Sequence, residues 1–161
     1  MGRIATVMAV TATIALAAAS CGGGGAPSKE EFIAQADAIC NTYNVRFACD
    51  VLHTYPEGDP TSLTSDDDVR AFADPFSATY DVYFQEFEEL GALAPPADFR
   101  EQYDALLASL DLTLQAIAQG AEAARNADRE GIADAMQKER ASSSEVSRIA
   151  KEYGFEVCGQ D

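Results

Sequence analysis

Apolar residues recur at spacings of three and four along most of the chain after residue 28, and this periodicity is the feature that most restricts the fold. The longest example runs over more than six turns and consists of Phe99, Tyr103, Leu106, Leu107, Leu110, Leu114, Ile117 and Ala121. Because an α-helix repeats every 3.6 residues, these side chains share one face of a helix. No segment shows the strict alternation of a half-buried strand. The sequence therefore predicts an all-α protein.

The first helix is predicted from Lys29 to His53. Ser28 followed by Glu31 is a capping box, in which each side chain bonds the backbone N–H of the other residue at the start of a helix. The stretch Thr54 to Thr64 has two prolines, a glycine and no periodicity, which predicts a loop.

A second capping signal at Ser65 opens another apolar stripe, made of Val69, Phe72, Phe76, Tyr80, Tyr83, Phe87 and Leu90. Pro75 interrupts this stripe, and proline suits the first turn of a helix. A short separate helix from Asp66 to Ala73, followed by a main helix from Pro75 to Leu90, is therefore a further option. Gly91 is expected to end the main helix.

Two further helices complete the pattern. The third starts after Pro95 and Pro96 and is expected to stop near Asn126. Asp128 can cap the fourth, and Gly154 is well placed to end it. Amphipathic helices joined by mostly short connections predict an antiparallel up-down-up-down four-helix bundle.

The first 20 residues have the pattern of an export signal. Arg3 is followed by an apolar and small-residue run from Ile4 to Ala19, which is too short and alanine-rich for a typical membrane span. The end of this run and the residues after it, Ala18-Ala19-Ser20-Cys21 followed by four glycines, resemble the lipobox of bacterial lipoproteins. We therefore expect a signal peptide over residues 1–20, a tether over 21–28 anchored by a lipid on Cys21, and a bundle domain over 29–161. The same residues also fit ordinary signal cleavage, which would release a soluble secreted chain from near Ser20.

Cysteine placement predicts one disulfide. Cys40 lies on the apolar face of the first helix, whereas Cys49 is nine residues further on and faces the other way. In an antiparallel bundle the C-terminus returns to the start of the first helix, where Cys40 is about 16 Å along the axis and Cys49 about 30 Å. We therefore predict a bridge between Cys40 and Cys158 and a free thiol at Cys49. If Cys21 carries no lipid, a second bridge from Cys21 to Cys49 becomes available.

Several segments together resemble a group of uncharacterised small lipoproteins of high-GC Gram-positive bacteria. These segments are the leader ending in Ala19-Ser20-Cys21, the glycine tether, Phe32 to Cys40, Leu93 to Pro96, and Tyr153 to Gly159. The resemblance covers nearly the whole mature chain and carries no catalytic motif. It implies an extracytoplasmic helical domain with paired cysteines at Cys40 and Cys158, and Cys49 is not part of its pattern.

Composition disfavours several classes of function. The formal net charge of -16 repels nucleic acid and anionic lipid headgroups, so membrane attachment would depend on the anchor. The single histidine, His53, gives no support to histidine-based metal sites. No phosphate-binding loop, haem attachment motif or nucleophile elbow occurs. We therefore expect no cofactor, no metal site and no enzymatic activity.

One polar residue stands out on an apolar stripe. Glu139 lies on the inner face of the fourth helix next to Ser143. Its carboxylate must find a partner, shift its pKa or reach water at the edge of that face. The candidate partners are the hydroxyls of Tyr43, Tyr80, Tyr83 and Tyr103, and of these Tyr80 and Tyr83 are the ones expected in a ligand site. Glu86, Glu88 and Glu89 are expected to form a solvated face.

Two hypotheses of function follow. The first is a membrane-anchored lipoprotein that acts through contacts with an envelope protein or as a spacer at the cell surface. The alternative is a helical domain that binds a small apolar ligand at Tyr80, Tyr83 and Glu139. A cavity at these residues would favour the alternative, and a second buried carboxylate beside a buried Glu139 in an open cleft would reopen the enzymatic hypothesis.

Overall fold

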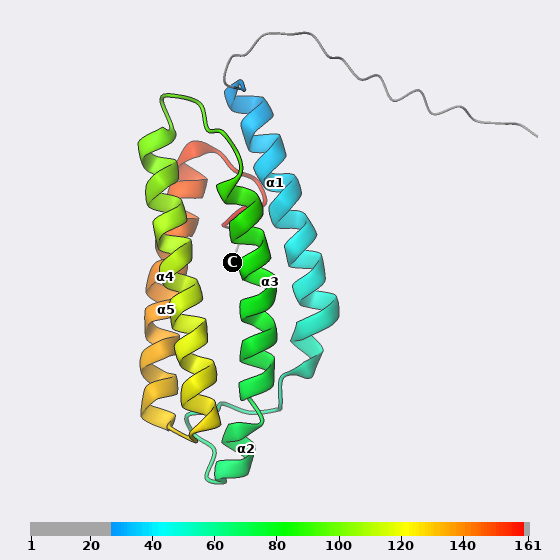
Figure 1. The fold of residues 1–161 in the computed structure, drawn as a ribbon, viewed down its shortest axis with the longest axis vertical. Helices are drawn as coiled ribbons and strands as arrows, with labels where there is room; N and C mark the ends of the chain where they lie inside the picture. The colour runs from blue at the N-terminus through cyan, green and yellow to red at the C-terminus, as the bar shows by residue number, and fades with distance from the viewer. Residues whose placement is uncertain (1–26, 160–161) are drawn as a thin grey trace, which may run out of the picture.

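The computed structural model describes residues 27–159 and confirms the all-α four-helix bundle. Its long helices are α1 (Lys29–Arg46), α3 (Ala73–Gly91), α4 (Arg100–Arg125) and α5 (Arg129–Tyr153). Successive long helices run in opposite directions (Figure 1). The described residues contain no strand. The predicted signal peptide and Cys21 lie outside these residues.

The helix ends follow the local chemistry of the sequence. The Ser28 hydroxyl accepts from the backbone N–H of Glu31 at 3.2 Å, and the Glu31 carboxylate accepts from the N–H of Ser28 at 2.9 Å, which confirms the capping box. The Asp128 carboxylate accepts from the N–H of Gly131 at the start of α5. Gly154 ends α5 with φ of 105°, a left-handed conformation that favours glycine.

The prediction of one continuous first helix to His53 is wrong beyond Arg46. A π-helical turn, η1 (Phe47–Val51), and a 3-10 turn, η2 (Leu52–Thr54), follow α1. The N–H of Leu52 bonds to the carbonyl of Phe47, which widens the turn by one residue. This rotates the segment so that Val51 is buried while Cys49 stays exposed.

The interruption near Pro75 is present, with a shifted boundary. A short helix, α2 (Asp66–Arg70), precedes α3, which begins at Ala73 rather than at Pro75. Pro75 thus lies in the first turn of α3, where a helix does not use the backbone N–H groups and the missing donor costs little. Gly91 is the last residue of α3, and Ala92 caps it.

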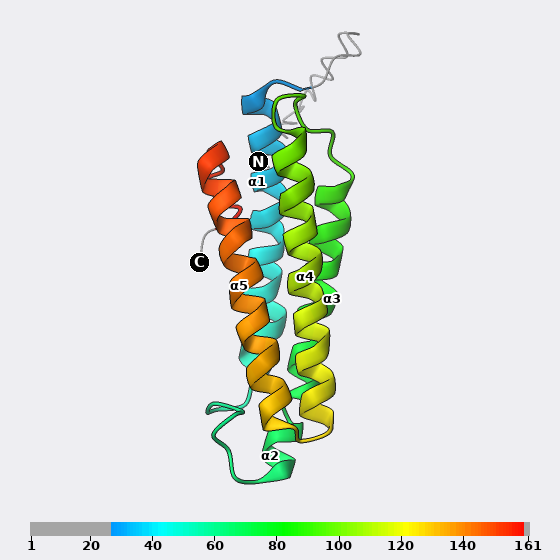
Figure 2. The ribbon, with the colours of Figure 1, turned by 90° about the vertical axis from the view of Figure 1, so that its left-hand side faces the viewer.

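The helices do not pack equally closely. Small residues let α4 and α5 approach, and a Cβ added at Gly120 would lie 3.6 Å from the Cβ of Ala135. Helix α3 packs against both α4 and α1, but α1 makes few close backbone approaches to α5. The C-terminal tail after Gly154 crosses this seam at one end of the bundle (Figures 1 and 2).

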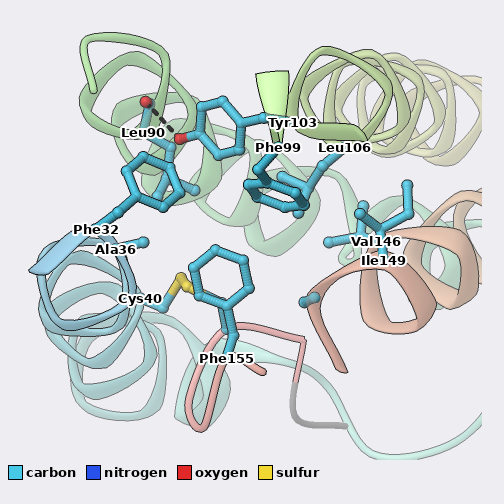
Figure 3. Close-up of a cluster of buried hydrophobic side chains, with 12 residues drawn as sticks. Phe32, Ala36, Cys40, Leu90, Phe99, Tyr103, Leu106, Val146, Ile149 and Phe155 are labelled. Atoms are coloured by element: carbon cyan, nitrogen blue, oxygen red, sulfur yellow. Dashed lines mark hydrogen bonds between the residues drawn. A yellow bond between two sulfur atoms is a disulfide. The ribbon is translucent and has the colours of Figure 1, made fainter. Parts of the chain in front are cut away.

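The tail is held to α1 by the predicted disulfide between Cys40 and Cys158, whose Cα atoms are 5.3 Å apart. Around it, aromatic side chains from α1, α4 and the tail form the main hydrophobic cluster (Figure 3). Phe155 lies against the disulfide, and Phe32 meets the ring of Tyr103 edge-on at 5.0 Å. This cluster closes the end of the bundle that holds the start of α1.

A carboxylate on α1 adds a polar clamp to the tail. Asp37 accepts three backbone N–H groups, from Glu156, Val157 and Cys158, each at 2.9 Å. Hydrogen bonds to a charged acceptor are stronger than neutral ones. The clamp and the disulfide therefore fix the tail across the upper part of the seam between α1 and α5.

Candidate functional site

The inner face of α3 differs from the predicted aromatic stripe. Its buried residues are Ala73, Pro75, Thr79, Val82, Glu86 and Leu90, one position before most of the stripe's aromatics. One residue corresponds to a rotation of about 100°. The aromatic residues of the stripe at positions 76, 80, 83 and 87 are only partly buried. Tyr83 stacks on Phe47 and Tyr80 on Phe84.

A cavity of about 330 Å³, here called the central cavity, lies inside the bundle between α1, α3, α4 and α5. The tail forms its upper end through Phe155, Val157 and Cys158. The remaining lining is mostly aliphatic and comes from all four long helices, with Ala36, Leu90, Leu106, Leu110, Leu114 and Val146 among its members. Its partly or fully exposed polar lining residues, Asn44 of α1 and Glu139 and Ser143 of α5, place its opening at the seam between these helices.

Small side chains explain why the space is unfilled. Helix α5 contributes Ser143 and Ser147 and α4 contributes Thr113, at positions where a packed bundle has Leu or Ile. The Thr113 hydroxyl donates to the Ser142 hydroxyl at 2.8 Å, so this polar contact is satisfied between helices. A serine is too short to reach across to α1, and the seam stays open at mid-height.

Glu86 is the most unusual residue of the central cavity. The prediction that Glu86 belongs to a solvated face is wrong, because its side chain is only 8% exposed. Within residues 27–159 the structure gives its carboxylate neither a hydrogen bond nor an ion pair. Burial raises the pKa of the Glu86 carboxyl from 4.5 to about 7.

A sequence signal for Glu86 was present. Thr79, Val82, Glu86 and Leu90 follow one another at spacings of three, four and four, so Glu86 lies between buried positions on one helical face. The more hydrophobic aromatic stripe beside it concealed this pattern.

Glu139 lies at the opening of the central cavity and is partly exposed. Its carboxylate accepts from the Ser143 hydroxyl at 2.8 Å, one turn further along α5. None of the candidate tyrosines bonds to it among the described contacts: the Tyr43 hydroxyl donates to Glu89 and the Tyr103 hydroxyl to the carbonyl of Leu90. Glu139 thus reaches water at the seam while facing the cavity.

Of the two predicted tyrosines, the structure brings only Tyr83 to Glu139. Tyr83 and Glu139 both line the central cavity, and both also line a second cavity of about 210 Å³ toward α2. Burial, with smaller contributions from the charges of Glu86 and Glu139, raises the pKa of the Tyr83 hydroxyl to about 12, so the hydroxyl is neutral and can donate at neutral pH. Tyr80 lines neither cavity.

The second cavity is more apolar and lies beside the π-helical turn. Phe47 from that turn, Tyr55, Phe76 and Met136 contribute to its wall. The Tyr55 hydroxyl is paired with the Thr79 hydroxyl at 2.7 Å. The two cavities share Tyr83 and Glu139, so the polar groups lie between two apolar spaces.

Cys49, a further predicted site residue, stands apart from both cavities. Cys49 is an exposed thiol that forms no disulfide with another described cysteine. Among residues 27–159, no three carboxylate, thiol or imidazole groups gather closely enough to hold a metal ion. None of the helices in this part of the chain has the length and apolar character to cross a bilayer.

Comparison with known proteins gives no relative: no family model, no curated protein and no solved structure matches this chain. The geometry of the central cavity is therefore the main indication of function.

Proposed function

We propose that this chain is an extracytoplasmic domain, anchored to the membrane by a lipid on Cys21, which binds a small and largely apolar ligand in the central cavity. The observation that carries the proposal is an interior space of about 330 Å³ with one unpaired, buried carboxylate. Binding sites for small molecules have this composition, with an apolar wall and few polar groups. The anchor follows from the lipobox-like residues before Cys21.

The cavity separates this proposal from the spacer hypothesis. A spacer needs only a stable bundle, and a stable bundle fills its core with side chains at crystal-like density. Here apolar side chains line an open space, and each lining atom forgoes contacts on that side. A ligand that fills the space would restore those contacts.

The cavity also indicates the size of the ligand. Its volume equals that of about eleven water molecules at ~30 Å³ each. A molecule of about eleven non-hydrogen atoms fits this space. At ~0.3 kcal/mol per atom or better, its dissociation constant lies in the millimolar range or below.

The test uses 4-phenylbutanol, an uncharged molecule of suitable size, with binding measured by saturation-transfer NMR and calorimetry. Wild-type protein is expected to bind it. A Ser143→Phe variant places a ring at the opening of the cavity and is expected to weaken binding at least tenfold, since Ser143 is a lining residue.

The matched control is Ser144→Phe, which adds the same ring one position away, at an exposed site outside the cavity. This variant should bind as the wild type does. Equal binding by all three proteins would place the probe on the surface and contradict the proposal, as would failure of the wild type to bind.

A further inference from the structure

The described residues that line the central cavity include acidic side chains but no basic ones. Glu86 and Glu139 are both among them, whereas none is a lysine, arginine or histidine. Both carboxylates act on the Tyr83 hydroxyl, which places them around one region of the cavity. The chain as a whole has a net charge of -16, which reinforces the negative potential inside the cavity.

Glu86 is a buried carboxylate without a partner among the described contacts. A buried carboxylate without a hydrogen bond or counter-charge is costly, and proteins normally supply one or the other. At 8% exposure Glu86 keeps only limited contact with water. The Tyr43 hydroxyl on α1 donates to Glu89 of the same helix as Glu86, at 2.7 Å.

The surrounding wall restricts which cation could serve. Divalent metal ions require several oxygen ligands or retained water. The central cavity has two carboxylates, and among the described residues no three carboxylate, thiol or imidazole groups gather closely enough to hold a metal ion. An ammonium group attached to an apolar body matches both parts of the cavity. The ring of Tyr83 also lines the cavity, and aromatic rings attract cations.

We propose that the ligand of the central cavity is an organic monocation, an apolar amine whose ammonium group pairs with Glu86 while its hydrocarbon part fills the space lined by Leu106, Leu110 and Leu114. This inference rests on the proposed function and narrows it to one chemical class. Glu139, at the opening and already bonded to Ser143, attracts the cation on entry but is not its main partner.

The experiment compares three probes with the same phenylbutyl body: 4-phenylbutylamine, which is cationic at pH 7, neutral 4-phenylbutanol and anionic 4-phenylbutyrate. Titration calorimetry is performed on the full protein at about 0.15 M salt, which screens attraction between exposed charges. Wild-type protein is expected to bind the amine at least tenfold more tightly than the alcohol and to bind the acid more weakly than either.

The deciding variant is Glu86→Gln, which keeps the shape of the side chain and removes the charge. In this variant the affinity for the amine should fall to that for the alcohol. Glu88→Gln removes one charge from an exposed position of the same helix and should preserve the amine preference. Circular dichroism verifies that each variant is folded.

The outcomes separate the two proposals. If the alcohol and the amine bind equally to the wild type, or if Glu86→Gln keeps the amine preference, the inference about charge is overturned while ligand binding in the cavity stands. If none of the three probes binds, both proposals fall. If Glu88→Gln lowers amine affinity as much as Glu86→Gln, the preference arises from the surface charge, which also overturns the inference.

Discussion

Replacing Glu86 by glutamine tests the burial of this carboxylate through the pH dependence of stability. The pKa of Glu86 is about 7 in the folded protein against an ordinary value of 4.5. The folded state therefore holds the proton more tightly, so the stability contributed by protonated Glu86 is complete below pH 4.5 and is lost as pH rises through 7. The full loss amounts to about 3 kcal/mol, at 1.36 kcal/mol per pKa unit.

The usable pH range is set by the acidity of the chain. Its isoelectric point is near 4.2, so the protein is expected to aggregate below pH 5. Between pH 5 and pH 8 the same linkage predicts a loss of about 2.5 kcal/mol in the free energy of unfolding. The free energy of unfolding is measured by urea titration with far-UV circular dichroism. From pH 5 to pH 8 the wild type should lose about 2.5 kcal/mol more of this free energy than Glu86→Gln loses.

The comparison with the variant removes the contribution of other acids. Exposed carboxylates such as Glu145, whose pKa the hydrogen bond from Arg148 lowers, titrate equally in both proteins. Glu88→Gln should show the same pH dependence as the wild type. If the difference between wild type and Glu86→Gln is the same at pH 5 and pH 8, Glu86 is solvated and the reasoning about the central cavity is wrong.

Other predictions concern the tail and the anchor. Reduction of the bridge between Cys40 and Cys158, which are 118 residues apart, should lower the free energy of unfolding by about 4–5 kcal/mol in the chain-entropy model, as measured by urea titration with and without reductant. Asp37→Asn should cost about 1–3 kcal/mol, because a neutral amide oxygen replaces the carboxylate that accepts three N–H groups, and hydrogen exchange of residues 156–158 should rise. Intact mass of protein from native membranes should show a diacylglyceryl group on Cys21, one disulfide and one thiol at Cys49, whereas a chain starting near residue 20 with two bridges would contradict the anchor.

Most of the fold could be predicted from the sequence because its signals are local. The signals are the spacing of apolar residues, the capping box at Ser28 and the glycine at 154, and each depends on a few neighbouring residues. They predicted all four long helices, although the first was predicted to extend beyond Arg46. The bridge from Cys40 to Cys158 also followed, since antiparallel topology and helix rise determine which ends meet. The π-helical turn after Arg46 could not be predicted, because no local signal distinguishes a widened turn from a regular one and its partner, Tyr83, comes from another helix.

The site was predicted only in part, since it depends on how helices rotate against one another. Glu139 was identified because it interrupts an apolar stripe on its own helix. Glu86 was missed because its burial depends on α3 turning its smaller residues toward α4, a choice made by packing between helices. Tyr80 fell outside the cavity for the same reason. Rotating a helix about its axis by one residue position leaves its backbone unchanged but determines which side chains face the interior.

The energetic cost of Glu86 bears on what the bundle is for. At pH 8, where Glu86 is ionised, the free energy of unfolding is about 3 kcal/mol lower than it would be with Glu86 protonated. Domains are typically stable by about 5–15 kcal/mol, so this is a large share. Leucine at this position would remove that cost and fill part of the cavity, so packing alone does not account for a carboxylate there. The disulfide and the Asp37 clamp compensate at the far end of the same seam, where they hold α1 and the tail together without filling the middle. A cationic ligand gives the unpaired charge its partner and the apolar walls their missing contacts at once, which is why we expect binding to stabilise the bundle most at the pH where Glu86 is ionised.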